Sequence, residues 1–271
     1  MTAMRRQIRA SLRVAAMALA TLSLLPVHMI ALRLCDGRAV VRLWHRWIAR
    51  IGGLRVAVHG SPCHSPGTLF VANHVSYLDI PLIGAEIAVD FVSRADVADW
   101  PVIGRLAKRA GTRFVDRRVG SVRAQAEALS RHVGEGASLL IFPEGTSSDG
   151  RQVLPFRSSL LAVATAAARV QPIAIRYVGA DGRPLDAETR RQVAWYGDMT
   201  LAPHLWAMLG LSAIEVEVAF LPIVTMSGFA DRKALARHCQ EAIAAAVAAP
   251  TYALPIGASV DRNWSVAAAQ E

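Results

Sequence analysis

Short apolar runs and helical stretches alternate along most of this chain, and that alternation limits the folds open to it. The apolar runs read as buried strands: 68–73, 89–93, 112–115, 137–142, 170–176 and 214–221. The stretches between them read as helices: 77–86, 98–110, 119–134, 157–168, 200–210 and 229–249. Such alternation predicts an α/β fold, with a mixed, largely parallel sheet flanked by helices.

The amino-terminal segment has a different pattern. Residues 14–32 carry no formal charge and are flanked by arginines. A helix of about twenty residues crosses a bilayer, so one span is possible, whereas Pro26 and His28 favour a re-entrant or half-buried helix. A cleaved signal peptide is the competing interpretation. Because no small-residue cleavage pattern precedes Cys35, we expect the segment to be retained.

The positive charge of the chain is concentrated on either side of this apolar segment. Residues 1–60 contain ten arginines and one acidic residue, and the rest of the chain is balanced. An excess that flanks an apolar segment indicates a membrane surface rather than nucleic acid. Residues 38–51 predict a basic amphipathic helix that lies among lipid headgroups or packs on its own domain. The positive-inside rule places the folded domain on the cytoplasmic side of the inner membrane.

These features predict three parts. Residues 1–60 form membrane-anchor helices, residues 61–250 form the folded domain, and residues 251–271 form a tail. The three cysteines are dispersed and the histidines lack ligand spacing, so neither a disulfide framework nor a metal site is expected.

A histidine and an aspartate five residues apart follow the first expected strand of the domain. Across a strand-to-helix turn, Asp79 can accept a hydrogen bond from His74, fix its tautomer and stabilise its charged form. The other ring nitrogen is then free to act as a general base. The spacing alone is weak evidence, so the interpretation depends on the later blocks.

Two further blocks follow strand ends. The block Gly-Thr-Arg-Phe-Val-Asp-Arg ends at Arg117, among other basic residues, and predicts either a phosphate-binding cluster or a solvated basic face. The block Phe-Pro-Glu-Gly-Thr-Ser-Ser contains Glu144, Gly145 and Thr146. These are either polar groups of a substrate site or an ordinary strand-ending turn. Because α/β folds place their sites at strand carboxyl ends, we expect these residues to lie near His74.

Taken in order with Val-Gln-Pro-Ile at residues 170–173, these blocks resemble the four motifs of the glycerolipid acyltransferases, particularly the bacterial 1-acylglycerol-3-phosphate acyltransferases. The resemblance covers about residues 67–176. It implies that His74 is the catalytic base and that Asp79 orients it. The acceptor-binding residues that it implies are Arg117, for the phosphate, and Glu144, Gly145 and Thr146.

The resemblance predicts transfer of a fatty acyl group from a thioester to the sn-2 hydroxyl of 1-acyl-glycerol-3-phosphate, which gives phosphatidic acid. Two positions depart from the family pattern. Ser147 stands where many members have arginine, and Gln171 precedes Pro172 where Val-Pro is common. The first departure leaves open another acceptor, such as a lyso-ornithine lipid. A non-catalytic membrane lipid-binding protein and a hydrolase are the alternatives from other classes.

The expected partners follow from this reaction. They are membrane lipids, a lysophospholipid acceptor, and acyl-CoA or acyl carrier protein as co-substrate, with no cofactor, metal or nucleic acid. No Gly-x-Ser-x-Gly elbow is present, so direct transfer without an acyl-enzyme is expected. The sequence leaves open the acyl-chain preference, the donor type and the oligomeric state.

Overall fold

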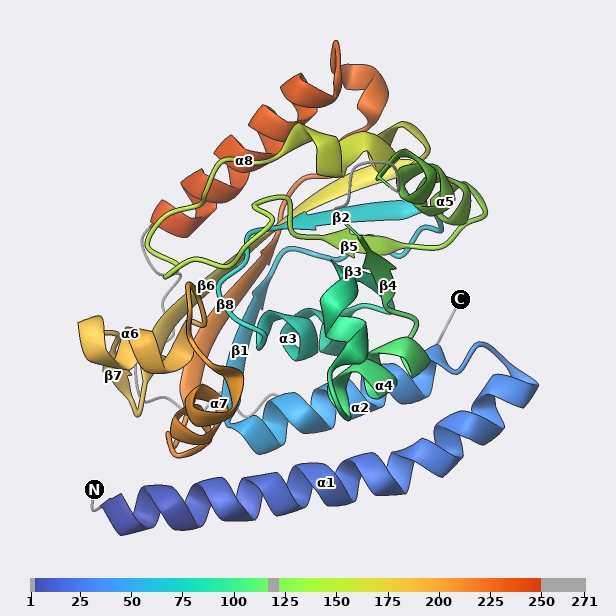
Figure 1. Ribbon diagram of the computed structural model, residues 1–271. Coiled ribbons are helices and arrows are strands. Elements are labelled where there is room, and N and C mark those ends of the chain that lie inside the picture. The colour runs from blue at the N-terminus through green and yellow to red at the C-terminus, as the bar shows by residue number, and fades with distance from the viewer. Residues whose placement is uncertain (1–2, 117–121, 250–271) are drawn as a thin grey trace.

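The computed structural model describes residues 3–116 and 122–249. Its centre is one mixed sheet (Figure 1). The strands are β1 (Leu54–His59), β2 (Thr68–Ala72), β3 (Asp90–Arg94), β4 (Arg113–Val115), β5 (Leu139–Ile141), β6 (Arg169–Ala180), β7 (Arg183–Pro184) and β8 (Ile214–Phe220). Their order is β1-β8-β6-β2-β5-β3-β4, with β7 paired to β6. Only the pairs β6–β8 and β6–β7 are antiparallel, which confirms the predicted fold class.

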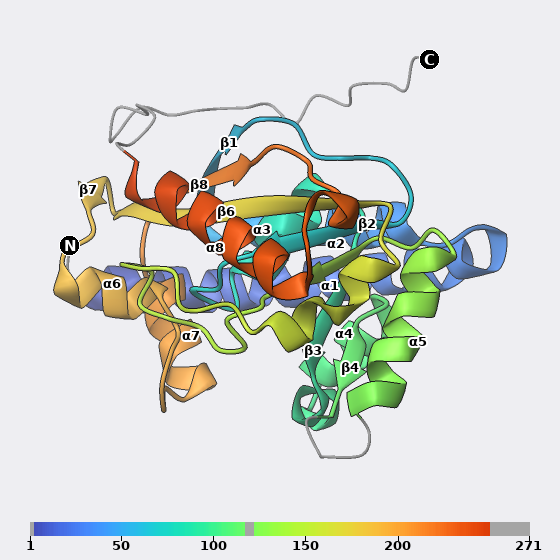
Figure 2. The same ribbon diagram turned by 90° about the horizontal axis from the view of Figure 1, so that it is seen from above.

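Helices cover both faces of this sheet (Figures 1 and 2). They are α1 (Ala3–Leu34), α2 (Arg38–Gly52), α3 (Asp79–Glu86), α4 (Ile103–Arg109), α5 (Val122–Gly134), α6 (Ala187–Val193), α7 (Leu201–Leu209) and α8 (Arg232–Ala248). Helices α5 and α8 lie on one face. Helices α2 and α3 lie on the other, and α1 runs beneath α2 at the edge of the molecule.

The sheet separates two apolar cores. In β2, Leu69 and Val71 belong to the core beneath α5 and α8, whereas Phe70 and Ala72 belong to the core beneath α2 and α3. Alternate side chains of a strand point to opposite faces of the sheet. Because both faces are covered here, every residue of β2 is buried. This explains why the central strands read as continuous apolar runs in the sequence.

Several elements differ from the sequence prediction. Strand β1 was not predicted; its residues fall within the 1–60 anchor segment, yet they pair in parallel with β8. Its burial alternates poorly because it lies at the edge of the sheet, so the pattern carried little signal. The expected helix 98–110 is interrupted at Pro101, and the expected helix 157–168 is a 3-10 helix over Ser158–Thr165. Helix α6 was also not predicted.

Two of the arginines of α2, Arg42 and Arg46, contact the folded domain. The Nε atoms of Arg42 and Arg46 donate hydrogen bonds to the carbonyl of Ala85, at 3.1 and 3.0 Å. Ala85 lies in the last turn of α3, where the helix dipole favours positive charge. The exposed large apolar side chains of α2 are Leu43 and Trp47. Arg42 and Arg46 thus pack on the domain, and contact of this helix with lipid headgroups stays a prediction.

Helix α1 is fastened to the domain near both of its ends. Arg6 forms an ion pair with Asp181 at 3.0 Å, and His28 donates from Nε2 to the carbonyl of Arg109 at 3.0 Å. These contacts are about 33 Å apart along the helix. Among the described residues, α1 is the one helix long and apolar enough to cross a membrane. Its docking along the domain places it flat against the protein instead of projecting away from it.

Candidate active site

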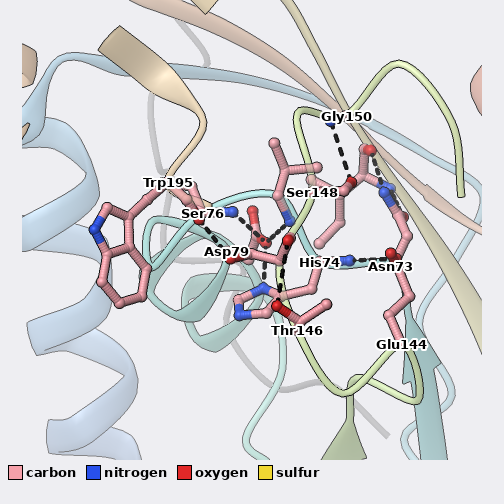
Figure 3. Close-up of polar contacts among 12 residues, drawn as sticks. Asn73, His74, Ser76, Asp79, Glu144, Thr146, Ser148, Gly150 and Trp195 are labelled. Atoms are coloured by element: carbon pink, nitrogen blue, oxygen red, sulfur yellow. Dashed lines mark hydrogen bonds and ion pairs between the residues drawn. The ribbon is translucent and has the colours of Figure 1, made fainter. Parts of the chain in front are cut away.

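Asp79 is the most completely satisfied polar residue of the site. Its Oδ2 accepts hydrogen bonds from His74 Nδ1 at 2.8 Å and from the backbone N–H groups of Val75 and Ser76 at 2.8 and 3.0 Å (Figure 3). The carboxylate is fully buried and begins α3, where the helix dipole favours an anion. The turn between β2 and α3 therefore wraps around this carboxylate and fixes its orientation.

His74 presents its other nitrogen toward the open side of the turn. Since an ionised carboxylate can only accept, Nδ1 carries the proton that Asp79 holds. Nε2 has no hydrogen-bond partner among the described residues, and the side chain keeps 20% of its surface exposed. The imidazole stacks on Phe142 with ring centroids 4.1 Å apart. The geometry is that of an unprotonated Nε2 ready to accept a proton.

Glu144 lies against His74 but does not face the open side. Its Oε1 accepts a hydrogen bond from the His74 backbone N–H at 2.9 Å, and its Oε2 accepts one from Leu154 at 3.2 Å. The residue is 2% exposed, and this burial raises the pKa of its carboxyl to about 7. Both oxygens are therefore engaged with the backbone, so the carboxylate holds the loop after β5 against the catalytic turn.

The next residues of the same loop are more open. Gly145 has a φ of 71°, a conformation that a side chain would strain, and Thr146 is exposed. The Ser148 N–H donates to the carbonyl of His74 at 3.0 Å, so the loop is attached on both sides of the histidine. The Ser147 hydroxyl donates to the carbonyl of Trp195. Four of the predicted site residues (His74, Asp79, Glu144, Gly145) thus lie within one connected turn-and-loop unit, with Thr146 at its rim.

A basic side chain that the sequence did not single out lies beside this loop. The Arg157 guanidinium covers Gly145 so closely that a Cβ built there would lie 3.3 Å from Arg157 Nε. Arg157 is exposed and has no carboxylate partner among the described residues. The predicted phosphate-binding residue, Arg117, lies outside the described residues.

Two buried residues support the catalytic turn from β6. The Asn73 side chain donates to the carbonyl of Ile175 at 2.9 Å and accepts from its N–H at 2.8 Å, which extends the β2–β6 pairing into the turn. The Tyr177 hydroxyl donates to Asp79 Oδ1 at 2.7 Å. Asn73 could have been found from the sequence, because it directly precedes His74. Tyr177 is 98 positions from Asp79, and no local pattern points to it.

An apolar cavity of about 130 Å³ is lined by residues of helices α1, α2, α3 and α4 and of strand β3. Its lining includes Leu24, Val41, Trp44, Ile80, Phe91 and Leu106. Ile80, which follows Asp79 in α3, is the lining residue nearest in sequence to the His74–Asp79 pair. Within residues 3–116 and 122–249, no cluster of three His, Cys, Asp or Glu side chains could hold a metal ion.

A histidine hydrogen bonded to a buried aspartate is an arrangement that suits general-base catalysis of acyl transfer to a hydroxyl. Comparison with known proteins identifies the class of enzyme. The family model described as Acyltransferase matches residues 55–176. The lyso-ornithine lipid O-acyltransferase of Brucella abortus is 38% identical, over 88% of this chain and 93% of the relative. The 1-acyl-sn-glycerol-3-phosphate acyltransferase of Neisseria meningitidis is 33% identical, over 78% of this chain and 81% of the relative.

The fold has a solved counterpart. The crystal structure of the 1-acyl-sn-glycerophosphate acyltransferase from Thermotoga maritima superposes with a TM-score of 0.65 and 20% sequence identity, over 89% of this chain and 96% of that one. The chain therefore belongs to the glycerolipid acyltransferase family. Lipid-acylating bacterial relatives, together with the exposed apolar side chains of α1, indicate that it associates with membranes.

Proposed function

We propose that this acyltransferase acylates the hydroxyl of a lysolipid with an amino-acid headgroup, of the lyso-ornithine lipid type. The observation that carries the acyl transfer is the His74–Asp79 hydrogen bond, which leaves His74 Nε2 without a hydrogen-bond partner among the residues that the structure describes. The observation that carries the acceptor choice is Ser147, which stands where the resemblance to phosphate-binding members leads one to expect arginine.

In the proposed reaction, His74 acts as the general base. Nε2 removes the proton from the acceptor hydroxyl as its oxygen attacks the thioester carbonyl, and Asp79 stabilises the imidazolium that forms. The tetrahedral intermediate then collapses by breaking the carbon–sulfur bond, and the departing thiolate takes the proton back from His74. Because a thiolate leaves readily, the reaction needs no acyl-enzyme and no cofactor beyond acyl-CoA or acyl carrier protein as donor.

The acceptor headgroup is proposed to contact the exposed side of the loop after β5. Position 147 has a hydroxyl that donates to the carbonyl of Trp195, where related enzymes are expected to have an arginine. This side of the site therefore lacks one hydrogen-bond donor group for a phosphate monoester. Arg157 remains as a guanidinium over Gly145 without a carboxylate partner among the described residues, which suits the one carboxylate of an amino-acid headgroup. Thr146 adds an exposed hydroxyl at the same edge.

The acyl chain and the membrane are accommodated on the other side of the dyad. The apolar cavity that Ile80 lines is a suitable place for part of an acyl chain, and residues of α1 and α2 form much of its wall. Because α1 is fastened near both ends, we infer that α1 and α2 enter one leaflet without crossing the bilayer, on the cytoplasmic side of the inner membrane.

1-Acyl-glycerol-3-phosphate is the second candidate acceptor. It is favoured by the sequence, in which Arg117 and Arg118 follow β4, and by the resemblance of the four motifs to enzymes that act on this lipid. On this alternative, Arg117 and Arg157 together would bind the phosphate that Ser147 does not.

An acyl-transfer assay on membrane fractions tests the proposal. Wild type, His74→Ala and the control His64→Ala, an exposed histidine away from the turn, are each given labelled acyl-CoA or acyl carrier protein donors. Each receives lyso-ornithine lipid and lysophosphatidic acid in parallel. We expect acylation of the lyso-ornithine lipid by wild type and His64→Ala, and loss of about 10³-fold or more in His74→Ala with membrane attachment unchanged.

The other outcomes are equally informative. His74-dependent formation of phosphatidic acid alone would replace the acceptor and retain the chemistry. Near-normal turnover by His74→Ala would remove the base assignment. Release of free fatty acid without an acceptor would indicate a hydrolase, and binding of lipid without any transfer would indicate a lipid-binding protein.

A further inference from the structure

The carboxylate of Asp79 is held from two directions that differ in origin. Oδ2 receives all three of its hydrogen bonds from the turn that contains His74. Oδ1 receives a hydrogen bond at 2.7 Å from the Tyr177 hydroxyl on β6, across the core beneath α3. Without that hydroxyl, one oxygen of a fully buried carboxylate would have no donor among the described residues.

The surroundings make this fourth hydrogen bond important. Asp79 contacts no arginine or lysine among the described residues, so hydrogen-bond donors and the His74 imidazolium must stabilise its charge. Glu144, on the loop after β5, is the other titratable group that interacts electrostatically with both His74 and Asp79, and Tyr77, on the turn itself, acts on the Tyr177 hydroxyl. A buried acceptor left unpaired is destabilised because it has lost water and gained no substitute.

Tyr177 is well placed to remain a donor. Burial and the neighbouring carboxylate raise the pKa of its hydroxyl well above the usual value, so it stays protonated over the working range of the enzyme. Its strand is also locked to the catalytic turn, because Asn73 exchanges two hydrogen bonds with Ile175, two residues earlier on β6. The phenol and the turn therefore keep a fixed separation.

We propose that Tyr177 is a positioning residue of the catalytic pair: its hydroxyl fixes the carboxylate of Asp79 so that Oδ2 faces His74, and it moderates the basicity of the imidazole. Each donor to the carboxylate draws charge away from the oxygen that faces the ring. Removal of the phenol hydroxyl leaves a less stabilised anion, which holds the imidazolium more tightly and raises the pKa of His74. The proposal rests on His74 acting as the base, as proposed above.

The decisive variant is Tyr177→Phe, which removes the hydroxyl and keeps the ring. Its matched control is Tyr196→Phe, because the Tyr196 hydroxyl forms no hydrogen bond among the described residues. With the acceptor that wild type uses, we expect the kcat of Tyr177→Phe to fall about 10-fold near pH 7 while KM stays within about 2-fold. The acid limb of the kcat/KM profile should move up by about 0.5 to 1 pH unit, so that the deficit shrinks as the pH rises.

The readouts separate a positioning role from loss of folding. The midpoint of a pH profile does not depend on how much of the enzyme is folded, and the His74 imidazole can also be titrated by NMR without turnover. Because Glu144 has a pKa of about 7, only variants that retain it are compared. An unshifted His74 titration and acid limb in Tyr177→Phe, whether or not the rate falls, would overturn the proposal.

The result that would contradict the proposed function differs from the one that would contradict the role of Tyr177. If His74→Ala retained turnover, the base assignment would fall, whatever Tyr177→Phe does. If wild type proved inactive on the tested acceptors, the NMR titration would still test the role of Tyr177. It would show whether the pKa of His74 in Tyr177→Phe differs from that in wild type and in Tyr196→Phe.

Discussion

The two sides of the catalytic turn are built in opposite ways. On the inner side, Asp79 is fully buried and each of its oxygens is hydrogen bonded, to the turn itself and to β6. On the outer side, Thr146 and Arg157 are exposed, and Ser147 contacts the protein through one hydrogen bond to a backbone carbonyl. The difference indicates that the chemistry depends on the core of the fold, whereas acceptor choice depends on a few surface side chains that can change without unfolding the protein.

The largest effect is expected on the inner side. Asp79→Asn replaces an acceptor with an amide that can donate to His74 Nδ1, which favours the tautomer with its proton on Nε2 and blocks the base. We expect kcat to fall about 10³-fold or more while the protein remains folded. Acyl transfer and circular dichroism measure the two properties. A decrease in kcat of less than about 10-fold would contradict the conclusion that the chemistry depends on the buried side of the turn.

On the outer side, a single charge should alter specificity rather than rate. Ser147→Arg adds a planar guanidinium beside Arg157 and should increase the use of lysophosphatidic acid relative to lyso-ornithine lipid about 10-fold. Ser147→Ala is the control, since it removes the hydrogen bond to Trp195 without adding charge. Competition between the two acceptors in one reaction measures the ratio. An equal change in both variants would trace the effect to the Trp195 contact instead.

The apolar cavity should respond to filling. Val41→Trp places a larger side chain in the lining, and we expect the rate with long acyl donors to fall about 10-fold relative to short ones. Leu43→Trp lies on the same helix but is exposed and outside the lining, so its chain-length profile should match wild type. The same profile in both variants would show that the acyl chain binds elsewhere.

Glu144 predicts a modest dependence of stability on pH. Its pKa is raised to about 7 by burial, so between about pH 4.5 and 7 the folded state binds a proton that the unfolded chain does not. The free energy of unfolding from this group therefore decreases as the pH rises through that window. Urea unfolding at about pH 5 and pH 8 should show a smaller pH difference for Glu144→Gln than for wild type. An unchanged difference would assign the slope to other groups.

The last prediction concerns the side of the membrane on which the start of α1 lies, and its variants should leave activity unchanged. Among the described residues, Cys35 is the exposed cysteine, and Cys63 and Cys239 are buried. In a Cys35→Ser background, Met4→Cys therefore marks the start of α1. A membrane-impermeant maleimide should label it in inverted vesicles but not on intact cells. Labelling from outside the cell would show that α1 crosses the bilayer.

Much of this arrangement could be predicted where the information is local. The short apolar runs of the central strands are buried on both faces, so they stand out, and the His74–Asp79 spacing matches a turn whose geometry is set within a few residues. Strand β1 lacks that pattern because it lies at the sheet edge. The role of the α2 arginines was ambiguous, since their periodicity suits lipid headgroups and the end of α3 equally well.

Contacts between distant parts of the chain were not predictable in the same way. Tyr177 meets Asp79 only because β6 pairs with β2, and Arg157 reaches Gly145 only because the loop after β5 folds back on itself. Neither residue belongs to a motif that carries its role. Glu144 shows the converse, since its motif was recognised, yet only its two backbone partners reveal that it faces inward.

The hydrogen bonds from Arg42 and Arg46 to Ala85 have a consequence for substrate selection. Helix α3 begins at Asp79 and ends beside these arginines, so it holds α2 and the His74–Asp79 pair about 12 Å apart. On our proposal that α1 and α2 enter one leaflet, the reaction takes place at a set height above the lipid surface. We then expect His74 to accept hydroxyl groups that a bilayer holds at that height, in preference to the same hydroxyl on a lipid dispersed in water.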